Sequence, residues 1–230
     1  GPKPALVSNQ IIQRDRHAEF LAAIANAGAT LEKMALEIRG LQKTEIREVQ
    51  EPFPPGRKGS SCMPHKKNPN LCERICGLAR ILRSYAITGF ENVALWHERD
   101  ISHSSVERIT LSDSCVLLDY MLAKMNWIVQ NLVVDTQRMS KNIESSNGVI
   151  YSQKVLLLLA RKGMTREDAY RIVQTCAMKV WDTNVQLLDA LKENEEIENV
   201  VSAQELEECF SIEGLLQNVD FIFNRIGLNL

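Results

Sequence analysis

Three long runs of apolar residues, spaced alternately four and three positions apart, limit what this chain can fold into. Such spacing is typical of long helices that are buried along one seam. The runs are Phe20, Ile24, Ala27, Leu31, Met34, Ile38 and Leu41; Leu71, Ile75, Leu78, Leu82 and Tyr85; and Leu111, Cys115, Leu118, Leu122, Met125, Val129 and Leu132. No strand-like alternation accompanies them. The sequence therefore predicts an all-α protein built on a bundle of long helices.

The pattern changes after Val134, which divides the chain into two predicted domains. Residues 1–134 carry the long seams, and we expect them to form part of a central helical-bundle domain. Residues 135–230 read as shorter helices in a smaller C-terminal helical domain, with start signals at Thr165 and Ser202, where a hydroxyl precedes a carboxylate by three positions. The long seams offer more apolar surface than three helices can cover, which predicts an oligomer.

Composition excludes several classes of protein. The 230 residues include 27 Lys and Arg against 29 Asp and Glu, so no overall basic field is available to bind nucleic acid or an anionic membrane. The six cysteines form no CxxC pair, and Cys72 and Cys76 have no nearby histidine to complete a metal site. No apolar run approaches the length of a membrane span. We expect a cytoplasmic protein without a metal ion.

The segment 51–69 breaks the helical pattern between the first two seams. It contains five of the seven prolines and two glycines, and its hydroxyls Ser60 and Ser61 stand among four cationic residues. Long bundle connections are usually lids, binding loops or disordered segments, and clustered donors and cations suit an anion. A proline-stiffened connector without a ligand is the alternative that composition alone leaves open.

Residues 59–73 resemble the signature of the fumarase/aspartase/argininosuccinate lyase superfamily, a pattern written SSxMPxKxN with a Glu five residues after the Asn. Residues 8–17 and 96–108 are in turn similar to the adenylosuccinate lyase family. The resemblance covers almost the whole chain, but members of this family carry a preceding half. We therefore expect the chain to be a C-terminal portion that lacks the N-terminal half.

This resemblance implies a β-elimination that releases fumarate. The substrates would be adenylosuccinate, giving AMP, and succinylaminoimidazole carboxamide ribotide, giving AICAR, in purine biosynthesis. Ser60 corresponds to the base that removes the carbon proton, with a mobile loop that closes over the site. Lys66 and Asn68 correspond to residues that bind the succinyl carboxylates, and Ser61 to a residue of the same turn. No cofactor is implied.

The same resemblance implies a nucleotide site elsewhere in the chain. Three residues match positions that hold the nucleotide phosphate, namely Arg99, Ser104 and Arg108, and three more match substrate contacts, namely Gln10, Arg14 and Arg74. The planar donor fork of arginine suits phosphate. Surface ion pairing with Glu98, Asp100 or Glu107 is the other interpretation. The implied assembly is a homotetramer whose active sites are shared between subunits.

Three questions stay open at this level. The general acid of the family is a histidine in the preceding half, so the roles of His65, His97 and His103 are not assigned. A sister enzyme such as argininosuccinate lyase, or a helical assembly module without activity, would share the fold. A chain that supplies only part of a shared site is expected to be inactive alone.

Overall fold

The computed structural model describes residues 3–53, 56, 62–63 and 65–228. Within them the chain divides into two compact units, residues 1–138 and 139–230. The domain boundary expected from the sequence, between residues 134 and 135, stays a prediction. In the part of the chain that the structure describes, no helix is both long enough and apolar enough to cross a membrane.

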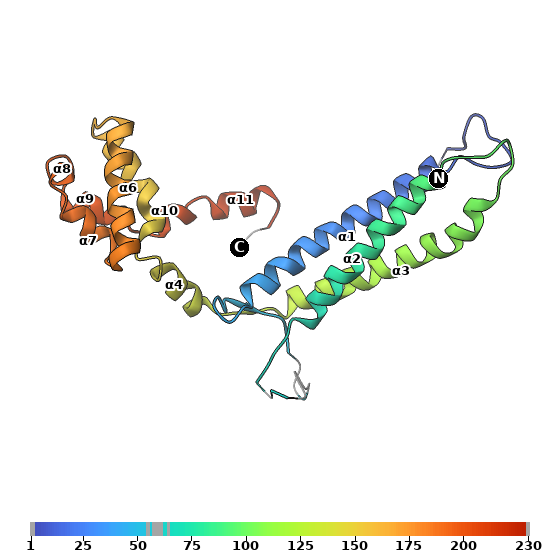
Figure 1. Cartoon of the computed structure of the whole chain (residues 1–230), viewed down its shortest axis with the longest axis horizontal. Helices are drawn as coiled ribbons and strands as arrows, with labels where there is room; N and C mark the ends of the chain where they lie inside the picture. Colours follow the sequence, from blue (N-terminus) through green and yellow to red (C-terminus); the bar gives the residue numbers. More distant parts are fainter. Residues whose placement is uncertain (1–2, 54–55, 57–61, 64, 229–230) are drawn as a thin grey trace. The chain divides into compact units, whose positions relative to one another are not determined.

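Three long helices form the first unit, and they lie side by side in Figure 1. They are α1 (Asp15–Leu41), α2 (Asn70–Glu91) and α3 (Ser102–Gln130). The all-α prediction is confirmed. The described residues of 51–69 contain no helix, as their proline content predicts.

A small antiparallel sheet was not predicted. Strands β1 (Val49–Gln50) and β2 (Val133–Val134) pair with Val49 opposite Val134. Two-residue strands are too short to show an alternating pattern, and the partners lie far apart in sequence. This pairing joins the segment that follows α1 to the end of α3.

The predicted apolar seams are only partly right. Ile24, Leu31 and Ile38 are buried, but Phe20 and Met34 of the same run are 48% and 40% exposed. The buried stripe of α1 also contains small residues that sequence spacing did not single out: Ala18, Ala25, Gly28 and Ala35. Small side chains set the contact face because they let α1 and α2 approach closely. Larger apolar residues are left at its edges.

The third seam is the least buried. Met125 is buried, whereas Leu122 and Val129 are 49% and 50% exposed. The residues that α3 does bury are His103, Thr110, Ser114, Met121, Met125 and Ile128. Within one copy, α3 therefore has an apolar surface that this unit does not cover. An oligomer would cover such a surface, but the oligomer stays a prediction.

Glycine allows α1 and α2 to touch. A Cβ on Gly89 would lie 2.8 Å from Leu21 Cδ1 and 3.3 Å from Ala18 Cα, whereas a Cβ on Gly77 would meet nothing within 4 Å. Backbone at 3.3 Å cannot rotate away as a side-chain end can. The antiparallel packing of the two helices thus depends on Gly89.

We predict opposite effects for two glycine-to-alanine changes in α2. Gly89→Ala should lower the stability of the first unit by roughly 1–3 kcal/mol through overpacking. Gly77→Ala should raise it by up to about 1 kcal/mol, because alanine is the better helix former. Native-state amide exchange of α1 and α2 measures both. A shift in the same direction for the two variants would contradict the packing described.

The second unit is built from shorter helices. They are α4 (Thr136–Glu144), which begins at the end of the first unit, the 3-10 turn η1 (Val149–Tyr151), α5 (Ser152–Arg161), α6 (Arg166–Thr183), α7 (Leu187–Lys192), α8 (Glu195–Glu198), α9 (Ala203–Glu208), α10 (Glu213–Leu216) and α11 (Val219–Arg225). Its core is centred on α5, α6 and α7 and includes Leu159, Ile172 and Leu191. Both predicted helix starts are confirmed: Thr165 and Ser202 accept hydrogen bonds from the backbone three residues on.

The cap of α9 gives this unit a predicted pH dependence. A hydrogen bond from Lys162, then bonds from the backbone and hydroxyl of Ser202, lower the pKa of Glu205 from 4.5 to about 2. Because the pKa of Glu205 is lower in the folded state, these hydrogen bonds stabilise the folded state above pH 4.5. This stabilisation is lost as the pH falls toward 2.

Amide exchange of α9 should therefore lose protection between about pH 4.5 and pH 2. Glu205→Gln should remove this dependence, because the amide does not titrate in this range. Glu208→Gln, an exposed change on the same helix, is the matched control. A dependence that survives in Glu205→Gln would assign it to another group.

Candidate active site

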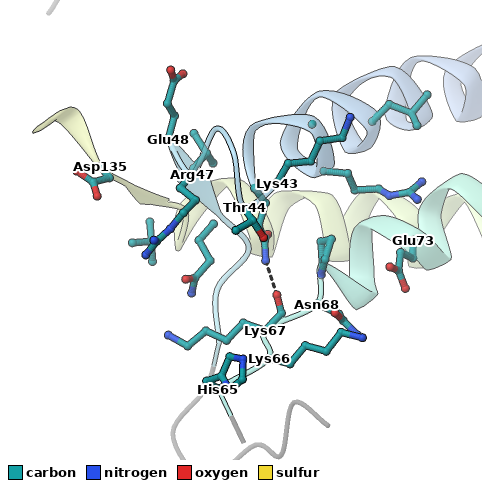
Figure 2. A pocket seen from close by; sticks show the side chains of 18 of the residues that line it. Lys43, Thr44, Arg47, Glu48, His65, Lys66, Lys67, Asn68, Glu73 and Asp135 are labelled. Carbon is teal, nitrogen blue, oxygen red and sulfur yellow. Dashed lines mark hydrogen bonds between the residues drawn. The ribbon is translucent and has the colours of Figure 1, made fainter. Parts of the chain in front are cut away.

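A cationic pocket of about 1010 Å³ lies where α1 ends, and Lys66 and Asn68 line it. Figure 2 shows side chains around it from the end of α1 and the turn after it, from residues 65–68, from the start of α2, and from Asp135, which follows β2. Five lining residues are cations and three are carboxylates: Arg39, Lys43, Arg47, Lys66 and Lys67, against Glu48, Glu73 and Asp135. The pocket is thus locally positive in a chain of net charge −2, as an anion site requires.

Backbone hydrogen bonds fix the chain around Lys66 and Asn68. The N–H of Lys66 donates to the carbonyl of Met63 at 3.1 Å, and the N–H of Asn70 donates to the carbonyl of Asn68 at 2.9 Å. Asn68 is half-buried and Lys66 is exposed. The ammonium is therefore free to reach an anion while its backbone is held. Ser60 and Ser61 lie outside the described residues.

Two residues that sequence reasoning missed hold this region. The Nε2 of Gln42 donates to the carbonyl of Lys67, and its Oε1 accepts from the backbone N–H of Glu51, both at 2.8 Å. The first of these bonds is the dashed line in Figure 2. The carboxylate of Glu51 in turn accepts from the N–H groups of Leu71 and Cys72, each at 3.0 Å. No local motif marks these contacts, because the bonded residues lie 9 to 25 positions apart in the sequence.

A second cluster of predicted site residues gathers at the opposite end of the helices. Arg14 immediately precedes α1, and its Nε lies 2.8 Å from Glu107 Oε1 on α3. Both atoms are buried, and among the described residues neither has a hydrogen-bond partner, so the contact is an ion pair and not a hydrogen bond. Ser104 and Arg108 occupy the first two turns of α3. The ion pair therefore brings Arg14 next to the predicted phosphate residues.

Two more predicted residues lie in segments that lead into this cluster. Gln10 precedes Arg14 by four residues, and Arg99 lies in the connection before α3; both are exposed. The alternative of surface ion pairing is not what the structure has, since Glu107 pairs with Arg14. Asp100 instead accepts from Ser102, whose backbone N–H and hydroxyl lower the pKa of Asp100. Among the described residues neither Arg99 nor Arg108 forms an ion pair, and both are exposed.

The length of α1 separates the two clusters. Arg14 stands at its start and Gln42 at its end, and the 27 residues between them span about 40 Å. Gln42 binds Lys67, the neighbour of Lys66 and Asn68. This separation is far longer than a mononucleotide. One copy of the chain therefore cannot place both clusters on the same small ligand.

Arg74 belongs to neither cluster. It is exposed on α2 and lines a mostly apolar hollow of about 490 Å³ with residues of α2 and α3, whereas its neighbour Glu73 lines the cationic pocket. Adjacent helical residues point in directions about 100° apart, so the two side chains serve different surfaces. The predicted substrate contact of Arg74 finds no counterpart in the pocket of Lys66.

The buried Cys72 is not a candidate nucleophile for this site. Among the described residues, no group of three or more His, Cys, Asp or Glu side chains is arranged to hold a metal ion. Burial, and then the charge of Glu51, raise the pKa of Cys72 to about 12. The Cys72 thiol thus stays protonated and unreactive at neutral pH.

Comparison with known proteins finds two matching families and several similar proteins. Residues 3–82 match the family described as Lyase, and residues 148–226 match the family described as Adenylosuccinate lyase C-terminus. The adenylosuccinate lyase of Thermotoga maritima is 50% identical over 98% of this chain and 52% of its own length. That of Bacillus subtilis is 49% identical over 99% of this chain and 53% of its own length.

Solved structures show the same fold. The 3-carboxy-cis,cis-muconate lactonizing enzyme from Pseudomonas putida aligns with a TM-score of 0.78 and 29% identity, over 90% of this chain and 46% of its own. A fumarate lyase from Mesorhizobium sp. BNC1 aligns with a TM-score of 0.82 over 94% of this chain and 47% of its own. At 24% identity the latter likeness concerns the fold alone.

Fold and matched segments together define the class, the superfamily of helical lyases. Within it, the chain belongs to the adenylosuccinate lyase family. It spans about half the length of the curated relatives it matches.

Proposed function

We propose that this chain supplies two separate parts of the active site of an adenylosuccinate lyase, which releases fumarate from adenylosuccinate and from the succinylated carboxamide ribotide. The observation that carries the proposal is the placing of two cationic clusters at opposite ends of α1. One holds Lys66 and Asn68 in the pocket. The other holds Arg108 beside the Arg14–Glu107 pair.

The pocket cluster suits the succinyl end of such a substrate. Removing a proton from the carbon beside a carboxylate creates a dianion, and fixed positive charge stabilises that charge as it develops. The ammonium of Lys66 supplies charge and the amide of Asn68 supplies direction. Ser60 then takes the carbon proton as an alkoxide, a form that nearby positive charge favours. The proton that the departing nitrogen needs comes from an acid outside this chain.

The second cluster suits the phosphate end. Arg99 and Arg108 offer planar donor forks, and Ser104 adds a hydroxyl one helical turn from Arg108. Since about 40 Å separates this cluster from Lys66, a substrate would take its phosphate contacts from one copy and its carboxylate contacts from another. A homotetramer in the cytoplasm, as expected from the sequence, provides such pairs of copies.

A sister lyase is the second candidate, because the pocket cluster alone fits any succinyl compound. Arg99, Ser104 and Arg108 distinguish the two, since argininosuccinate has no phosphate for them to bind. The test is calorimetric titration of AMP and of argininosuccinate into the full-length protein, meaning the natural protein that contains this chain. Binding of AMP, weakened by Arg108→Ala, supports the proposal. No heat at millimolar AMP would remove the nucleotide assignment.

A further inference from the structure

Two side chains outside the matched signature hold both ends of the segment that carries the proposed base. Gln42 is the residue directly after α1, and it bonds to Glu51 on one side and to Lys67 on the other. The segment between those two residues contains Ser60. Its ends are thus brought together on a single side chain.

Glu51 does a second task at the same place. The residue at the cap position of α2 is Pro69, which offers no side-chain cap. The carboxylate of Glu51, only 3% exposed, instead accepts from the N–H groups of Leu71 and Cys72 in the first turn. A carboxylate there also meets the positive end of the helix dipole. Asn68, two residues before α2, is placed by this cap.

These contacts make a continuous chain of hydrogen bonds. It runs from the end of α1 through Gln42 to Glu51, and from Glu51 to the start of α2. A second branch runs from Gln42 to the carbonyl of Lys67, next to Lys66. Closing a long connection this way restricts where its ends can go, which is what a site needs when its groups come from a loop.

We propose that Gln42 and Glu51 are positioning residues for the elimination, which hold Lys66 and Asn68 at the pocket that Gln42 also lines. The inference rests on the proposed function, because it assigns these two residues a task in that same site. The hydrogen bonds that Glu51 accepts from the amides of Leu71 and Cys72 can be tested without measuring turnover, by amide exchange.

Gln42→Glu is the sharpest kinetic test. The carboxylate keeps an acceptor for the N–H of Glu51 but has no N–H to donate to the carbonyl of Lys67. We expect kcat per folded site to fall about tenfold, because the hydrogen bond to Lys67 is replaced by repulsion between a carboxylate and the carbonyl oxygen. Circular dichroism and assembly should be unchanged. Gln130→Glu makes the same chemical change at the exposed end of α3 and should leave kcat unchanged. Wild-type kcat in Gln42→Glu would overturn the role of Gln42.

Glu51 is tested by amide exchange on the full-length protein. Glu51→Ala should speed exchange at Leu71 and Cys72 roughly tenfold, because their N–H groups lose a charged acceptor. Glu51→Gln keeps an acceptor oxygen and should restore most of the protection and most of kcat. A purely structural role would lower the melting temperature without changing kcat per folded site. That result, or unchanged exchange in Glu51→Ala, would overturn the role of Glu51.

The two readouts separate failure of this inference from failure of the proposed function. A wild-type protein that releases no fumarate contradicts the function, while loss of exchange protection in Glu51→Ala still confirms the hydrogen-bonded clamp. Fumarate release that is insensitive to Gln42→Glu contradicts the inference and leaves the function standing.

Discussion

Co-expression of a Lys66→Ala chain with an Arg108→Ala chain should restore fumarate release that each variant alone has largely lost. Each change removes a charged contact to substrate, which is worth about 2–5 kcal/mol and so lowers activity by roughly 30-fold or more. Recovery follows from the separation of the two clusters along α1. A site that joins an intact Lys66 from one copy to an intact Arg108 from another has lost nothing.

The size of the recovery is also predicted. In randomly mixed oligomers each of the two residues is intact with a chance of one half, so about one quarter of the sites are complete in a symmetric assembly. The two chains carry different tags, so that only mixed oligomers are measured. The control is a chain with both substitutions, co-expressed with wild type. If Lys66 and Arg108 of one site come from different copies, about a quarter of the sites should be active. If they come from the same copy, about half should be active.

Ser60→Ala should cause the largest single loss. General base catalysis contributes about 10²- to 10⁴-fold to a rate, so we expect kcat to fall by roughly three orders of magnitude. KM should change little, because the carboxylate contacts of Lys66 and Asn68 remain. Steady-state fumarate release by the full-length protein measures both.

The matched control is Ser84→Ala on α2. Its hydroxyl is exposed and only donates to the carbonyl of Ile81, so its removal should leave kcat unchanged. Activity of Ser60→Ala within tenfold of wild type would refute the assignment of the base. The cationic pocket would then need another group to take the proton.

The helical architecture could be predicted because helix periodicity is local. Apolar spacing found all three long helices, and the hydroxyl-carboxylate pairs at Thr165 and Ser202 found two helix starts. The face that each helix buries was harder to predict. Phe20 and Met34 have the spacing of a seam, yet the contact between α1 and α2 is centred on smaller residues such as Gly28, which a size-based pattern does not weigh.

The site could be predicted only where its residues lie in one motif. Lys66 and Asn68 were predicted by resemblance, and the structure shows that both line one pocket. Gln42 and Glu51 were missed because their partners are remote in sequence, and a lone glutamine after a helix carries no signal. The ion pair of Arg14 with Glu107 was missed for the same reason. Pairings between distant segments need the fold before they can be seen.

The separation of the two clusters is the claim on which the function depends. The structure of the full-length protein with adenylosuccinate bound to a Ser60→Ala variant tests it most directly. We predict that Lys66 of one copy lies within salt-bridge distance of a succinyl carboxylate, while Arg99 or Arg108 of a second copy contacts the phosphate of the same molecule. A ligand that takes both contacts from a single copy, or that binds far from Lys66, would contradict this account.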